Sequence, residues 1–133
     1  VLIIENPVYQ AIDENNMPYK IEAQKGRQEL HDSITLDRLR VELSKKNGGN
    51  IVILGDFGKY DKNSQVIDLE GRIEIKDDDG ITITTEVLHL DLLTGKTFGN
   101  KKVTISMDQG SNLIASAFTI VEKDGKGFFE GPI

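Results

Sequence analysis

The sequence predicts an all-β fold in which two twisted antiparallel sheets face each other across an apolar interior. Three observations lead to this prediction. One stretch alternates cleanly between apolar and polar residues, turn signals recur about every 15 residues, and a longer unit of about 30 residues repeats along the chain. Short alternating segments separated by turns are typical of antiparallel β proteins.

The clearest alternation covers residues 66–75. One face of this stretch carries Ile67, Leu69, Ile73 and Ile75 around Gly71. The other face carries Asp68, Glu70, Arg72 and Glu74. A period of two residues indicates a strand with one face toward an apolar interior and the other toward water.

Shorter strands are expected before this stretch. The apolar run at residues 1–4 predicts a first strand or, as the alternative, the tail of a removed membrane anchor. We expect residues 8–12 and 19–23 to be strands on either side of a turn at 13–16. Residues 24–32, which follow the second of these strands, are polar and include His31.

Residues 33–43 fit two patterns. Three leucines have helical spacing, whereas a strand with a slip at residues 37–40 also accounts for the apolar positions. We favour the strand, because both flanks are strand-like and a β-bulge explains the slip. Asn-Gly-Gly-Asn at residues 47–50 then predicts a tight turn.

The second half of the chain continues the alternation. Residues 81–93 change face near Thr85 and Glu86, which a bulge or a strand break would explain. Further strands are expected at residues 103–107 and 113–120.

Residues 77–80, three consecutive aspartates followed by Gly80, invite comparison with a calcium loop, and Glu86 stands six positions after the glycine. The calcium loop of an EF-hand alternates its ligands and lies between helices. Here the aspartates are consecutive and the flanks are strands. We therefore predict a hairpin turn in which Gly80 supplies the positive φ, and no metal site.

A longer repeat pairs an apolar residue with a small residue two positions later. The four pairs are Ile21 with Ala23, Ile53 with Gly55, Ile83 with Thr85, and Leu113 with Ala115, and their first members are 32, 30 and 30 positions apart. We expect each small residue to mark a corner where a strand bends from one wall to the facing wall, because a bulky side chain would crowd that corner. Gly71 is expected to serve the same purpose.

Length and composition limit the function. A chain of 133 residues predicts one domain, residues 1–133. A net charge of −6 argues against a nucleic-acid partner, since binding phosphates needs a basic patch. There is no cysteine to form a disulfide or ligate a metal, and no cofactor is predicted. The start at Val1 is consistent with a fragment whose targeting or anchoring segment precedes it.

Enzymatic function has little support in the residues. His31 and His89 are the two histidines, and His89 lies on an alternating strand where an outward position is expected. The chain has no cysteine nucleophile and no phosphate-binding glycine loop of the GxxxxGK[ST] type. Two interpretations of the aliphatic interior remain open, an ordinary sandwich core and a groove between splayed sheets for an aliphatic ligand.

Several motifs in order resemble the LptC family. They are GDFGKYD at 55–61, VIDLEGRIEI at 66–75, DGITITTE at 79–86 and LHLD at 88–91, together with NPVY at 6–9, PYKIEA at 18–23, LIASAF at 113–118 and FEG at 129–131. Gly55 and Ala117 depart from the alanine and glycine expected in the family, but both stay small. The resemblance covers nearly the whole chain.

The resemblance implies an open, boat- or V-shaped β-jellyroll in the periplasm, anchored to the inner membrane by a segment outside this chain. Lipopolysaccharide would be received from an inner-membrane ABC transporter and passed, without enzymatic chemistry, to a soluble periplasmic jellyroll that bridges toward the outer membrane. Acyl chains would lie between the sheets. The interior positions expected to contact them are Ile21, Ile53, Leu69, Ile73, Ile75, Ile83, Leu113 and Phe118.

End-to-end docking of jellyrolls would use the strands at the two ends of the sheets, since unpaired strand edges accept further strands. Val8 and Tyr9 would face the transporter side, and Phe128 and Phe129 the next jellyroll. Two other hypotheses are the soluble (LptA-like) bridge component of the same system, and a closed β-sandwich that binds carbohydrate or mediates adhesion.

Overall fold

The structure, a computed structural model, describes the backbone of residues 2–46, 48–99, 103–107, 112–115, 117–121 and 126–130. Side chains are described as far as Met107, with the exception of Leu30. All statements below refer to these residues.

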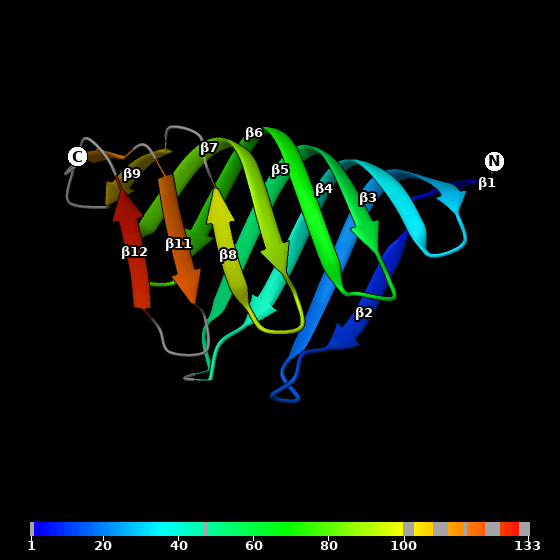
Figure 1. The fold of residues 1–133 in the computed structure, drawn as a ribbon, viewed down its shortest axis with the longest axis horizontal. Coiled ribbons are helices and arrows are strands. Elements are labelled where there is room, and N and C mark those ends of the chain that lie inside the picture. Colours follow the sequence, from blue (N-terminus) through cyan, green and yellow to red (C-terminus); the bar gives the residue numbers. More distant parts are fainter. Residues whose placement is uncertain are drawn as a thin grey trace.

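The described chain is all-β, as the sequence predicts, and its strands form one 12-stranded antiparallel sheet (Figure 1). The strands are β1 (Leu2–Glu5), β2 (Val8–Ile12), β3 (Pro18–Leu30), β4 (Ser33–Ser44), β5 (Asn50–Asp61), β6 (Val66–Asp77), β7 (Ile81–Asp91), β8 (Lys96–Gly99), β9 (Val103–Met107), β10 (Asn112–Ala115), β11 (Ala117–Val121) and β12 (Lys126–Glu130). The expected pair of sheets is thus a single sheet folded on itself.

Five long strands, β3 to β7, contribute to both halves of the folded sheet. Their outer neighbours show where the halves separate: residues 18–22 of β3 pair with β2, whereas residues 25–28 pair with β1. At the other end, residues 81–84 of β7 pair with β9, and residues 89–91 with β8. The sheet therefore forks at both ends into two walls.

The first wall contains β2, β9, β10 and one half of each long strand, namely residues 18–23, 39–44, 50–55, 73–77 and 81–85. The second wall contains β1, β8, β11, β12 and the other halves, namely residues 25–30, 33–37, 57–61, 66–70 and 87–91. The line along which the long strands pass from one wall to the other is called the corner below. In Figure 1, β1 and β2 lie at one end of the long axis and β9, β11 and β12 at the opposite end.

The inward face of a strand changes parity at the corner. In β5, Ile53 is buried on the first wall, whereas Gly58 and Tyr60 are buried on the second. In β7, Ile83 and Thr85 are followed by Leu88 and Leu90. The expected change of face near Thr85 is therefore present, within one continuous strand.

The small residues of the repeat lie at this corner. Ala23, Gly55 and Thr85 are the last inward positions of the first wall in β3, β5 and β7, the three strands that run from the first wall to the second. A Cβ atom on Gly55 would lie 3.1 Å from Leu69 Cδ2 and 3.6 Å from Ile73 Cγ1, so the position faces the interior. The 30-residue repeat thus follows from every second strand bending in the same way.

The strands that run the other way bend by a left-handed backbone. Asn6 between β1 and β2, Arg38 in β4 and Arg72 in β6 have φ values of 49°, 50° and 44°. At Arg38 the register with β3 and with β5 is the same on both sides of the bend. The predicted bulge at residues 37–40 is therefore wrong, since the change of face comes from one left-handed residue.

Large and small side chains alternate across the corner. Ala23 pairs with Leu39, which pairs with Gly55, while Ile73 pairs with Thr85. Leu39 and Ile73 are 2% and 1% exposed. Each large side chain occupies space that its small neighbours leave free, which lets the two walls meet closely.

The strand expected at residues 19–23 is longer than predicted, because β3 runs from Pro18 to Leu30 and includes most of the polar residues 24–32. The inward position of this half-strand is Gly26, where a Cβ would lie 3.2 Å from Pro7 Cγ and 3.4 Å from Leu36 Cδ2. The outward positions face water. A strand with glycine inside and polar residues outside lacks the apolar alternation by which strands are identified.

Gly58 and Leu39 should be energetically coupled. A Cβ on Gly58 would lie 2.8 Å from Leu39 Cδ1, so Gly58→Ala should destabilise the fold by about 1–3 kcal/mol through overpacking. Leu39→Ala should cost about 2–5 kcal/mol by leaving a cavity. The double variant should lose at least about 0.5 kcal/mol less than the sum, as measured by urea unfolding. Gly48→Ala, where no atom lies within 4 Å of the added Cβ, should be additive with Leu39→Ala.

Gly71→Ala should destabilise the fold by about 1–2 kcal/mol, because a left-handed conformation disfavours a side chain and the φ of Gly71 is 84°. The exposed neighbour Glu70 provides the control, and Glu70→Ala should change the unfolding free energy by less than about 0.5 kcal/mol. Equal effects of the two substitutions in thermal or urea unfolding would contradict a backbone origin.

Candidate functional site: the space between the walls

The space between the walls is lined by aliphatic side chains. Of the interior residues predicted from the sequence, six have described side chains, and their exposed fractions are Ile21 0%, Ile53 1%, Leu69 1%, Ile73 1%, Ile75 6% and Ile83 5%. Leu113 and Phe118 lie in β10 and β11, but their side chains are outside the described residues. All six described candidates are therefore buried on the inward faces of the walls.

Of the six described candidates, five come from the first wall and Leu69 belongs to the second. Sequence reasoning left out of the site the second-wall residues that face them, which include Ile34, Leu36, Tyr60, Ile67, Leu88 and Leu90. The apolar alternation at residues 88–92 could have identified Leu88 and Leu90 as interior residues. For Tyr60 the signal is weaker, since a tyrosine between lysine and aspartate has few features of an interior position.

Gly71 does not face the interior as the alternation suggests. A Cβ built on Gly71 would meet the side chain of Asp56 at 3.0 Å, and that carboxylate binds the exposed Arg72 guanidinium on the outer surface. Two successive left-handed residues, Gly71 and Arg72, carry β6 around the corner and displace the glycine from the inward series. Gly71 is thus a corner residue that points outward.

Of the other site residues predicted from the sequence, the structure describes the side chains of some and not of others. Ala23 and Gly55 lie at the corner, while the side chain of Ala115 is outside the described residues. At the N-terminal end, Val8 is 57% exposed and Tyr9 is half-buried against the core. Phe128 and Phe129 belong to the edge strand β12, but nothing is described of their side chains.

The interior is filled by the protein's own side chains. The buried apolar residues from the two walls form one cluster, in which Ile21, Leu36 and Leu90 are fully buried. By contrast, one hollow of the described surface lies on the outside of the corner among Arg38 and Asp56. A ligand between the walls would therefore have to separate them or replace contacts between them.

The edge of the interior that lies opposite the corner, where the long strands end in turns, is called the rim below. Several polar groups of the interior lie at this rim. The Tyr19 and Tyr60 hydroxyls lie 3.3 Å apart, and Gln65 Nε2 donates to Tyr19 Oη at 2.7 Å. Burial and the hydrogen bond with Tyr19 raise the pKa of Tyr60, so this hydroxyl stays neutral. Ser33 Oγ is buried without a hydrogen-bond partner among the described atoms.

The outer surface of the walls is charged. Lys20 and Glu22 form an ion pair at 2.8 Å, and Asp68 lies 2.6 Å from His89 Nδ1. His89 is thus outward, as expected, between the buried Leu88 and Leu90. Hydrogen bonding from Arg72 lowers the pKa of Asp56. Exposed pairs of this kind contribute little to stability because water and salt screen them, so their main effect is to keep the outer surface in water.

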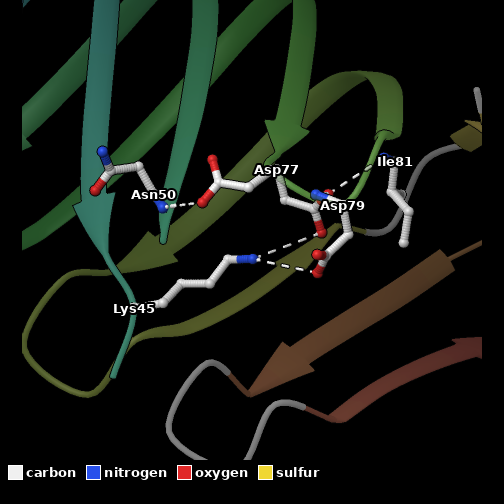
Figure 2. Close-up of polar contacts among 6 residues, drawn as sticks. Lys45, Asn50, Asp77, Asp79 and Ile81 are labelled. Atoms are coloured by element: carbon white, nitrogen blue, oxygen red, sulfur yellow. Dashed lines mark hydrogen bonds and ion pairs between the residues drawn. The ribbon is translucent and has the colours of Figure 1, made fainter. Parts of the chain in front are cut away.

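The acidic turn at residues 77–80 forms a hairpin, as predicted, with a φ of 81° at Gly80. Asp77 Oδ1 accepts the backbone N–H groups of Asp79 and Ile81, and Lys45 Nζ lies 3.9 Å from Asp77 and 3.6 Å from Asp79 (Figure 2). The lysine thus counters the aspartate charge and joins two turns of the first wall. Among the described residues, no group of three or more His, Asp or Glu side chains is arranged to hold a metal ion.

Within the residues that the structure describes, the strands at both ends of the folded sheet are paired on one side. There β1 and β2 pair with β3, β10 pairs with β9, and β12 pairs with β11. The N-terminal edge exposes the large apolar residues Leu2, Ile3, Val8 and Ile12. Unpaired edges with apolar side chains accept further strands from other chains.

Comparison with known families agrees with this geometry. Residues 1–126 match the family described as LptC, lipopolysaccharide-assembly, LptC-related. The chain belongs to the LptC-related family. The match extends from β1 to the first residue of β12, so it includes strands of both walls.

A curated relative is the uncharacterized protein RP506 of Rickettsia prowazekii (strain Madrid E), which is 19% identical over 132 residues. The alignment covers 99% of this chain and 65% of the relative, so the chain spans somewhat less than two thirds of that protein's length. In the described part of this LptC-related chain, no helix is long and apolar enough to cross a membrane.

Ile73→Asp should destabilise the fold by about 3 kcal/mol or more, because the side chain is 1% exposed and an unpaired carboxylate at such a site is costly. Leu69→Asp, on the facing wall, should behave in the same way. Ile73→Val is the size control and should cost about 0.5–1.5 kcal/mol in urea unfolding. Wild-type stability of both aspartate variants would contradict the inward orientation of these residues.

Proposed function

We propose that this LptC-related domain is a non-enzymatic conduit for lipopolysaccharide, with the acyl chains held between the two walls and the sugars in water. Membership of the family implies a role in lipopolysaccharide transport. The observation that carries the proposal for this chain is the opposition of two aliphatic faces, with the charged side chains on the outside, over the part of the chain whose side chains are described. Each buried methylene of an acyl chain would contribute about 0.8 kcal/mol.

The same proposal assigns a direction of transfer along the folded sheet. The β1 and β2 end would receive lipid from the inner-membrane ABC transporter, and the β10 and β12 end would pass it to the soluble periplasmic bridge protein. Support comes from the unpaired strands at both ends and from the exposed apolar residues of β1 and β2. Strand addition at each end would place successive interiors in line. We place the domain in the periplasm, held near the inner membrane.

A closed β-sandwich that binds no lipid is the second candidate, because the interior of this structure is filled. That candidate predicts walls that never separate.

The soluble bridge component of the same export system shares the expected fold. The N-terminal segment of the complete protein distinguishes the anchored component from the soluble bridge. A retained membrane helix favours the anchored component, and a cleaved signal peptide favours the bridge.

Photocrosslinking tests the proposal directly. A photoreactive residue at Ile73, which is buried between the walls, should crosslink to lipopolysaccharide, whereas the same probe at the exposed Glu70 should not. Because Glu70 lies on the same strand, the pair controls for probe chemistry and for lipid that adheres to the surface. A folded protein with no crosslink at Ile73, or with equal crosslinks at both positions, would favour the closed sandwich.

A further inference from the structure

The rim of the interior is closed near the N-terminal end by contacts that cross from one wall to the other. Tyr19 belongs to the first wall, and Tyr60 to the second, yet their hydroxyls lie 3.3 Å apart. The Tyr9 ring, on β2 of the first wall, lies 5.7 Å from the Tyr60 ring. These tyrosines are 41 and 51 positions apart from Tyr60 in sequence, so only the folding of the sheet brings them together.

Gln65 strengthens this connection from the second wall. Its Nε2 atom donates to Tyr19 Oη at 2.7 Å and to the Ile12 carbonyl at 3.2 Å, both on the first wall. Its backbone is fixed to the second wall, because its N–H donates to Asp61 and its carbonyl accepts from Leu92. The side chain therefore reaches from a fixed base across the rim.

A backbone hydrogen bond makes a further crossing beside it. The N–H of Glu14, in the turn between β2 and β3, donates to the carbonyl of Leu93, in the turn between β7 and β8, at 2.9 Å. The first turn belongs to the first wall and the second turn to the second wall. Tyr9, Tyr19, Tyr60, Gln65 and the Glu14–Leu93 hydrogen bond are together called the latch below.

Further along the rim of the first wall, the described contacts are of another kind. Lys45 pairs with Asp77 and Asp79, and Asp78 accepts the N–H of Asn50. These contacts join turns within the first wall and do not reach the second. The latch therefore differs from them in linking the walls, and it can break without unpairing any strand.

We propose that the latch controls access of an amphiphile to the space between the walls, which stays closed while Tyr19, Tyr60, Gln65 and the Glu14–Leu93 hydrogen bond connect them. This inference rests on the proposed lipid-conduit function. The interior is filled when the latch is closed, so acyl chains can enter only as the walls separate. The latch groups are hydroxyl, amide and backbone groups, which water can replace at the rim once the walls separate.

A reversible crosslink across the latch tests the proposal. The chain contains no cysteine. The 2.9 Å hydrogen bond from Glu14 N to Leu93 O keeps the two Cα atoms within the roughly 7 Å that a disulfide requires. Glu14→Cys with Leu93→Cys should lose lipopolysaccharide crosslinking at Ile73 by about tenfold or more when oxidised, because open molecules become rare. Reduction should restore it.

A disulfide inside one wall is the matched control. Thr84 of β7 and Thr104 of β9 are paired residues of the first wall. Thr84→Cys with Thr104→Cys should keep lipopolysaccharide binding in both redox states. If the oxidised Glu14–Leu93 variant is folded by circular dichroism and binds lipopolysaccharide as well as this control, the latch proposal is wrong, and lipid enters without opening this rim.

A loosened latch should have the opposite effect. Tyr60→Phe removes the hydroxyl that contacts Tyr19 and keeps the ring, so uptake of lipopolysaccharide should be faster by about fivefold, the factor that corresponds to one hydrogen bond. Equal rates for wild type and Tyr60→Phe would argue against the latch.

The failures of the two proposals can be told apart. If wild type, the reduced variant and the Thr84–Thr104 control all fail to bind lipopolysaccharide, the conduit function itself fails, and the latch falls with it. If all three bind and the oxidised Glu14–Leu93 variant also binds, only the latch fails. Hydrogen exchange at the Glu14 amide gives an independent readout, since exchange should accelerate when lipopolysaccharide is added to wild type.

Discussion

The corner is the constraint on which the rest of this structure depends. Five long strands belong to both walls. In each strand, the apolar side chains must therefore change from one face to the other at the corner, while the strand stays paired with its neighbours. Strands running one way place a small residue such as Gly55 inside, and strands running the other way use a left-handed residue such as Arg38 or Arg72. Because a corner built in this way tolerates only small groups beside large ones, Leu39 and Ile73 alternate with Ala23, Gly55 and Thr85.

In a folded sheet of this kind, different contacts hold the corner and the rim. Strand pairing fixes the corner and the length of each wall, whereas the distance between the walls at the rim depends on side chains and turns. Backbone hydrogen bonds along every long strand hold the corner. Near the N-terminal end, the latch holds the two walls together at the rim. Wall separation therefore needs less disruption at the rim than at the corner.

Charged and apolar side chains are divided between the outward and inward faces of the sheet. The inward faces are almost wholly aliphatic, and the outward faces carry pairs such as Lys20 with Glu22 and Asp56 with Arg72. The N-terminal end adds a third kind of surface, where the large apolar residues of β1 and β2 are exposed. The described part of this LptC-related chain thus has an apolar interior, a water-facing exterior and an apolar N-terminal edge.

The sequence by itself determined the strand content, most inward positions and the spacing of the corners, because alternation and small residues are local patterns. It also identified the family by the order of its motifs. Only the tertiary structure decided that there is one folded sheet, that Gly71 points outward, and that residues 24–30 are a strand, because left-handed residues and an inward glycine interrupt the alternation. The meeting of Tyr19, Tyr60 and Gln65 was likewise beyond the sequence, since residues more than 40 positions apart come together only when the two walls face each other.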